Sequence, residues 1–120
     1  MKRLILGLLL LSVPAAAQAM NVAEFLAKAN ALEKKGAMAM FSGDLKLLKN
    51  EIQTAGKAVR AEQVAAQKGG RKPATCMPKS VSLNDKDILS HFRAIPPDQR
   101  GASVKTAFAG MMRKKYPCPA

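Results

Sequence analysis

The sequence predicts an all-α protein, a small bundle of about four helices closed by one disulfide. Apolar residues recur at spacings of three and four along most of the chain, and no stretch shows the sustained alternation of a half-buried strand. Two cysteines, Cys76 and Cys118, occur in a short chain that begins like an exported protein, and such a pair usually forms a disulfide. Metal binding is the alternative, but zinc usually takes four protein ligands, or three and a water, and His91 is the single histidine.

The first 19 residues are typical of a cleavable signal peptide. Lys2 and Arg3 precede an apolar run over residues 4–13, and a small-residue stretch follows it. An uncleaved anchor is the alternative, but about ten apolar residues in a helix span about 15 Å, and a bilayer core is roughly 30 Å thick. We therefore expect a periplasmic protein whose mature chain, residues 20–120, is a single helical domain with no transmembrane segment.

Residues 20–68 are predicted to form long amphipathic helices. Asn21 can cap the first helix, with Glu24 three residues later, and Gly36 can end it. The next stretch predicts a helix from about Met38 to Gln67, with a seam expected where one helix packs along another. The seam consists of Met38, Phe41, Leu45, Leu48, Ile52, Ala55 and Val59.

Two features of this long helix leave alternatives open. Gly43 and Gly56 each cost about 1 kcal/mol against Ala inside a helix, so a break near residues 42–44 is the alternative to a continuous helix. Helical spacing places Met38 in the core, and an adaptable methionine-rich binding surface is the alternative. The seam itself can pack within one chain or across a homodimer.

The second half of the chain begins with a linker over residues 69–75, where two glycines and a proline resist helix continuation. Residues 76–118 are then predicted to form a disulfide-closed pair of helices. Ser82 or Asn84 can cap the first, which ends before Pro96, and the second runs from about Ser103 to Lys115. Closing this loop of roughly 43 residues is expected to stabilise the fold by about 4 kcal/mol.

The chain is strongly basic, with 20 Lys and Arg residues against 8 Asp and Glu residues and a formal charge of +12, which falls to +10 without Lys2 and Arg3. A tentative basic stripe beside the seam is formed at helical spacing by Lys46, Lys49, Lys57 and Arg60, with Gln53 among them. None of these cations has an acidic residue three or four positions away, so repulsion within the stripe is unrelieved. An anionic partner would relieve it, and a solvated face that maintains solubility is the alternative.

The disulfide-closed segment resembles part of a known family. Its features are the opening Cys76-Met77-Pro78, the break at Ile95-Pro96-Pro97, and the closing helix that leads into Tyr116-Pro117-Cys118. Over this third of the chain the sequence resembles the Tai family, periplasmic immunity proteins that neutralise cell-wall amidases delivered by type VI secretion. The resemblance implies an all-helical, disulfide-bonded, often dimeric protein that plugs the active-site cleft of an amidase.

No arrangement of residues predicts an enzyme, and no catalytic residue, metal site or cofactor is assigned. Any proton-transfer chemistry would need His91, which Asp87 can reach one helical turn away, but a locally satisfied histidine explains this pair. We therefore expect an exported binding protein, an immunity or inhibitor protein that occludes a cell-wall hydrolase. The alternatives are a polycation that binds anionic lipid, lipopolysaccharide or nucleic acid, and a periplasmic chaperone.

Overall fold

The computed structural model describes residues 19–119, and the predicted signal peptide lies outside this range apart from Ala19. In the described part the chain is all helical, and its one β contact is an isolated bridge between Asn21 and Ser103. The elements are α1 (Val22–Lys35), the 3₁₀-helix η2 (Gly36–Phe41), α2 (Gly43–Lys68), α3 (Asp85–Ala94), the 3₁₀-helix η3 (Pro97–Gln99) and α4 (Val104–Lys115). Together with the disulfide between Cys76 and Cys118, this confirms the predicted four-helix, disulfide-closed fold.

The predicted caps fix the helix ends. The side chain of Asn21 accepts a hydrogen bond from the Glu24 backbone at 2.8 Å and so starts α1. Gly36 ends it with φ of 57°, a conformation in which glycine is favoured over residues with a Cβ. Asn84, one of the two predicted candidates, caps α3 in the same manner, and Ser103, expected as the first residue of the last helix, caps α4.

The long helix begins later than the spacing predicts. Ser42 caps α2, its hydroxyl accepting from the Asp44 backbone at 3.3 Å, so the alternative of a break at residues 42–44 is correct and the start at Met38 is wrong. The turn at Gly36 and this cap leave only η2 between the two helices. As a result Met38 is 66% exposed, and its predicted place in the core is also wrong.

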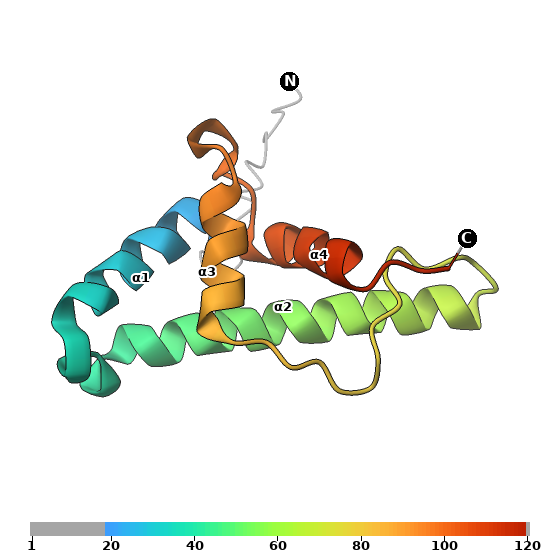
Figure 1. Ribbon diagram of the computed structural model, residues 1–120. Coiled ribbons are helices and arrows are strands. Elements are labelled where there is room, and N and C mark those ends of the chain that lie inside the picture. Colours follow the sequence, from blue (N-terminus) through green and yellow to red (C-terminus); the bar gives the residue numbers. More distant parts are fainter. Residues whose placement is uncertain (1–18, 120) are drawn as a thin grey trace, which may run out of the picture.

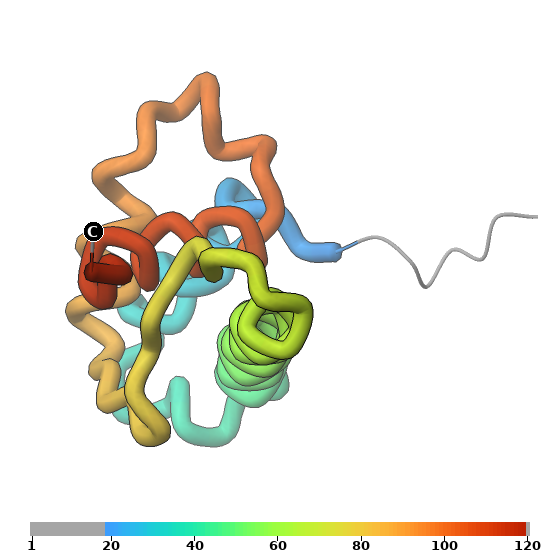
Figure 2. Tube along the Cα trace, turned by 90° about the vertical axis from the view of Figure 1, so that its right-hand side faces the viewer, coloured from blue at the N-terminus to red at the C-terminus, as the bar shows by residue number. Residues whose placement is uncertain are grey.

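The other helices gather on one side of α2. Figure 1 shows α1 and α4 lying along the same side of α2, with α3 standing between them, and Figure 2 shows α2 nearly end-on with the rest of the chain beside it. The most extensive helix contact is between α2 and α4. The seam residues Leu48, Ala55 and Val59 are buried within this one chain, together with the apolar face of α4.

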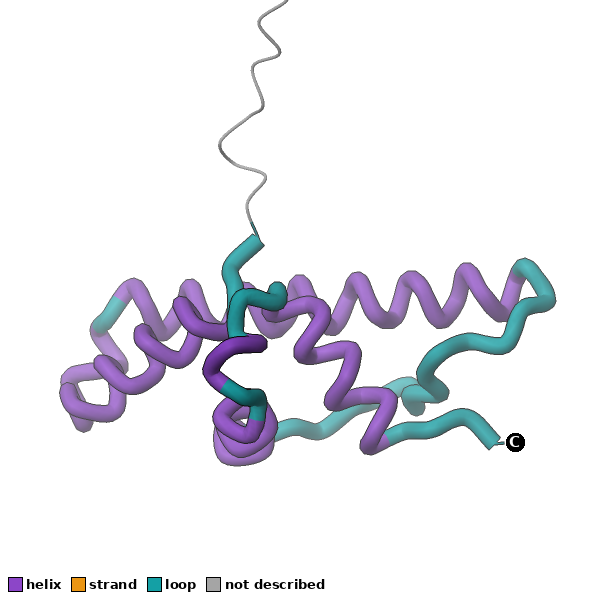
Figure 3. The backbone as a smooth tube through the Cα atoms, turned by 90° about the horizontal axis from the view of Figure 1, so that it is seen from above, coloured by secondary structure: helices purple, strands orange, loops and turns teal. Residues whose placement is uncertain are grey.

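Backbone hydrogen bonds join the two ends of the helical core. The Val104 N–H donates to the Met20 carbonyl at 2.9 Å, and the Val22 N–H donates to the Ala102 carbonyl at 3.0 Å. The start of α1 is therefore fixed to the start of α4. Between α2 and α3, residues 69–84 form an irregular loop that returns from the far end of α2 toward the middle of the molecule (Figure 3).

Candidate functional site

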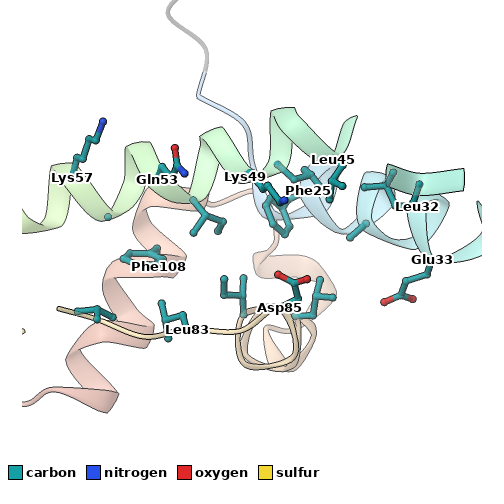
Figure 4. Close-up of a pocket in the computed structure, with 18 of the residues that line it drawn as sticks. Phe25, Leu32, Glu33, Leu45, Lys49, Gln53, Lys57, Leu83, Asp85 and Phe108 are labelled. Carbon is teal, nitrogen blue, oxygen red and sulfur yellow. The ribbon is translucent and has the colours of Figure 1, made fainter. Parts of the chain in front are cut away.

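A cleft of about 810 Å³ lies between the helices. All four α-helices and the loop of residues 69–84 contribute to its walls, which are mainly apolar. Figure 4 shows Phe108 of α4 and Leu83 of the loop facing α2 across this space, with Phe25 toward α1. The apolar residues that line it are Phe25, Ala29, Leu32, Ala39, Leu45, Leu48, Ile52, Met77, Val81, Leu83, Ile88, Leu89 and Phe108.

The cleft exists because part of the predicted seam lacks a helical partner. Leu45 and Ile52 lie on the same face of α2 as the buried Leu48, but both remain only partly buried. Opposite them lies the irregular segment that carries Val81 and Leu83, and not a fourth long helix. An apolar surface therefore stays open to solvent at the centre of the domain.

The polar residues at the cleft are divided by charge. On the α2 side the cleft is bordered by Lys49, Gln53 and Lys57, which follow one another at intervals of four residues (Figure 4). The acidic residues are Asp85, in the first turn of α3, and Glu33 of α1. Glu33 is already paired with the Arg93 guanidinium at 2.7 Å.

The structure therefore places the residues of the basic stripe in three different environments. Lys49 and Lys57 border the cleft, and Lys46 is exposed outside it. These three lysines take part in none of the ion pairs found among residues 19–119, which join Lys28 to Asp44, Arg93 to Glu33 and Lys105 to Glu62. The three stripe lysines thus keep their charges available.

Arg60, the fourth member of the stripe, is used within the fold. Its guanidinium donates to the carbonyls of Met77, Pro78 and Lys79 at 3.3, 2.6 and 3.4 Å. These three backbone acceptors use three of the five N–H donors of the guanidinium and hold it toward the loop. Arg60 borders the cleft but acts as a clamp for the returning loop.

Gln63, one turn further along α2, completes this clamp. Its amide pairs with both backbone groups of Met77, accepting from the N–H at 2.8 Å and donating to the carbonyl at 3.2 Å. The same amide oxygen accepts from the Thr75 hydroxyl at 3.3 Å. Gln63 and Thr75 are only 7% and 3% exposed, so a buried polar network holds the loop against α2.

The disulfide fastens the same loop from the other side. Cys76 is bonded to Cys118, with Cα atoms 4.9 Å apart, and the Cys76 N–H donates to the Tyr116 carbonyl at 3.0 Å. The loop is therefore held both to α2 and to the segment after α4. These two attachments position the wall formed by Met77, Val81 and Leu83.

A second surface feature is an apolar corner at η2, which we define as Met38, Met40 and Phe41. These side chains are 66%, 78% and 86% exposed, the largest values among the exposed large apolar residues of the described chain. Figure 1 shows this corner projecting at the end of the molecule where α1 turns into α2. It is convex, in contrast to the cleft.

His91 lies apart from both features, beside a shallow depression between α3 and α4. Burial lowers its pKa below the ordinary value of 6.5, the nearby Lys114 ammonium lowers it further, and the Ala107 backbone acts in the opposite direction. Asp87 lines the same depression. His91 is therefore a half-buried histidine that favours its neutral form, and we interpret it as a structural residue.

The sequence did not predict the cleft, the clamp residue Gln63 or the structural role of Arg60.

Within residues 19–119 no group of three or more His, Cys, Asp or Glu side chains could hold a metal ion. No helix in that range is both long and apolar enough to cross a bilayer. Comparison with protein-family models, with curated proteins and with solved structures gives no match.

Proposed function

We propose that this chain is an exported, periplasmic binding protein, and not an enzyme, that inhibits a cell-wall hydrolase by inserting its apolar corner into the hydrolase's active-site cleft. The export signal and the resemblance of residues 76–118 to the Tai family support the compartment and the class of partner. A peptidoglycan amidase is the partner that the resemblance favours.

The observation that carries the proposal is the exposure of Met38, Met40 and Phe41 on one projecting turn. Exposed apolar groups clustered in this way mark interaction surfaces on soluble proteins. Methionine adapts to irregular cavities, and an aromatic residue supplies much of the energy at interface centres. Because α1 and α2 hold the turn at both ends, little conformational entropy would be lost on binding.

The test is a pull-down from an envelope extract of the native organism, with the oxidised exported protein as bait and mild crosslinking. We expect a cell-wall hydrolase among the captured proteins, and stoichiometric inhibition of its release of peptidoglycan fragments. Phe41→Ser should weaken capture and inhibition at least tenfold, since burial of a Phe side chain contributes about 1.5–3 kcal/mol.

Leu47→Ser is the matched control, because Leu47 is also a partly exposed apolar residue, at 39%, outside the corner. It should leave inhibition unchanged. Capture of no hydrolase, or equal inhibition by the Phe41→Ser protein and the wild type, would refute the proposal.

A further inference from the structure

The cleft has an apolar interior and an unneutralised cationic border, and the proposed inhibitory function uses neither. We propose that it is a binding site for a single-chain fatty acid, whose acyl chain lies along the apolar walls and whose carboxylate is held by Lys49, Gln53 and Lys57. This site is separate from the corner and does not rest on the proposed function.

The size and shape of the cleft match a long, thin apolar ligand. A volume of about 810 Å³ falls within the usual range for small-molecule sites, which in helical proteins lie between helices. Its lining follows α2 from Leu45 to Arg60, which corresponds to about 22 Å at the helical rise. Gln53 lies near the middle of this length, so an acyl chain that starts beside it has about 10–12 Å of α2 wall in either direction. Its methylenes leave no buried polar group unpaired.

The head group is assigned by the side chains of α2. Lys49, Gln53 and Lys57 are spaced about 6 Å apart along the helix axis. In Figure 4 the side chains of Gln53 and Lys57 extend from α2 away from Phe108 and Leu83, so the carboxylate is placed at the outer border of the cleft beside Gln53, where rotation of the flexible lysine side chains brings both ammonium groups to it. A carboxylate only accepts hydrogen bonds, and the lysine ammonium groups and the glutamine NH₂ all donate them. Arg60 is not assigned to the head group, since the three carbonyls of residues 77–79 hold its guanidinium toward the loop.

The other charged groups at the cleft give the ligand its orientation. Asp85 lies on the α3 side, opposite the lysines, and repels a carboxylate placed there. Glu33, the second acid, is neutralised by its ion pair with Arg93. A cationic amphiphile of equal chain length would meet Lys49 and Lys57 at its head group and should bind weakly.

Isothermal titration calorimetry of the oxidised exported protein tests the site with three probes at low salt, each below its micelle concentration: dodecanoate, hexanoate and dodecyltrimethylammonium. We expect dodecanoate to bind saturably with one molecule per chain, and native mass spectrometry should show the same stoichiometry. Each methylene removed should weaken binding by about fourfold, so hexanoate should not bind measurably. Dodecyltrimethylammonium should bind at least tenfold more weakly than dodecanoate.

The variant Lys49→Gln/Lys57→Gln should lower the affinity for dodecanoate at least tenfold, because it removes two charge-assisted hydrogen bonds. The matched control is Lys46→Gln/Lys68→Gln, which removes the same charge from exposed positions of α2 outside the cleft and should change the affinity less than twofold. Both variants replace exposed side chains, so circular dichroism should show an unchanged fold.

Three results would each overturn the site: equal binding of the two dodecyl probes, equal loss of affinity in the two double variants, or non-saturating uptake of several dodecanoate molecules per chain. Loss of hydrolase inhibition has no bearing on these measurements. Conversely, Phe41→Ser should bind dodecanoate as the wild type does, so failure of one proposal is distinguishable from failure of the other.

Discussion

Replacing Gln63 by Met keeps a side chain of similar length at a buried position of α2 but removes the amide that holds the returning loop. The wild-type amide makes three hydrogen bonds, two with the backbone of Met77 and one with the hydroxyl of Thr75. Met77 is itself only 6% exposed, so water cannot readily replace the lost partner. Gln63→Met therefore leaves buried polar groups unsatisfied.

The expected cost follows from these contacts. A typical internal hydrogen bond contributes about 0.5–1.5 kcal/mol net, and a buried group left without a partner costs about 1–3 kcal/mol. We expect Gln63→Met to lower the free energy of unfolding by about 2–4 kcal/mol. That is a large share of the 5–15 kcal/mol typical of a domain. Thr75→Val, which removes only the hydroxyl, should cost about 1 kcal/mol.

Urea unfolding followed by circular dichroism, with the disulfide intact, measures both losses. Gln67→Met is the matched control, since Gln67 is exposed on the same helix, and it should change the free energy of unfolding by less than about 0.5 kcal/mol. Indistinguishable unfolding midpoints for Gln63→Met and Gln67→Met would refute the assigned role of the buried amide. Since the loop carries one wall of the cleft, Gln63→Met should also weaken the binding of dodecanoate.

Four further changes have expected outcomes in the same unfolding assay. Gly56→Ala should stabilise the protein by about 0.5–1 kcal/mol, because a Cβ there meets the nearest ring atom of Phe108 at an ordinary 3.7 Å and removes a helix-interior glycine, whereas Gly70→Ala, at φ of 68°, should destabilise it by about 1 kcal/mol. Replacing both Cys76 and Cys118 by Ser should cost about 4 kcal/mol through the released loop, less any residual structure in the unfolded chain. Because the pKa of His91 is lowered in the folded protein, the unfolded state takes up a proton more readily. The contribution of His91 to stability is therefore complete above pH 6.5 and is lost as the pH falls through the pKa of the folded protein, and His91→Gln should remove this part of the pH dependence below pH 6.5.

The helices could be predicted because their signals are local. Asn21, Asn84 and Ser103 each cap a helix through a backbone group three positions away, and the apolar face of α4 recurs at the helical period. The start of α2 was ambiguous for the same reason. The apolar spacing continues through Met38 and Phe41, and only the cap at Ser42 opposes it.

The candidate site could not be predicted because its contacts are not periodic. Gln63 and Arg60 bind backbone groups 14 to 19 residues away, in a segment without regular structure, and any backbone segment offers the same N–H and carbonyl groups. The cleft likewise exists because no helix packs opposite Leu45 and Ile52, although these two residues have the same spacing as the buried seam residues. The sequence marks these positions as apolar but does not say which of them remain uncovered.

The position of each lysine distinguishes a role in binding from a role in solubility, whereas the number of lysines does not. Solubility follows net charge, so Lys46→Gln, Lys49→Gln and Lys57→Gln should affect it equally, since each removes one exposed charge from α2. Binding follows position, because only a lysine at the cleft can donate a charge-assisted hydrogen bond to a ligand held there. Arg60, as part of the clamp, donates to three carbonyls of the returning loop and so has a structural role. A stripe that looks uniform in the sequence thus contains one structural cation, one solvated cation and two cations positioned to recognise an anion.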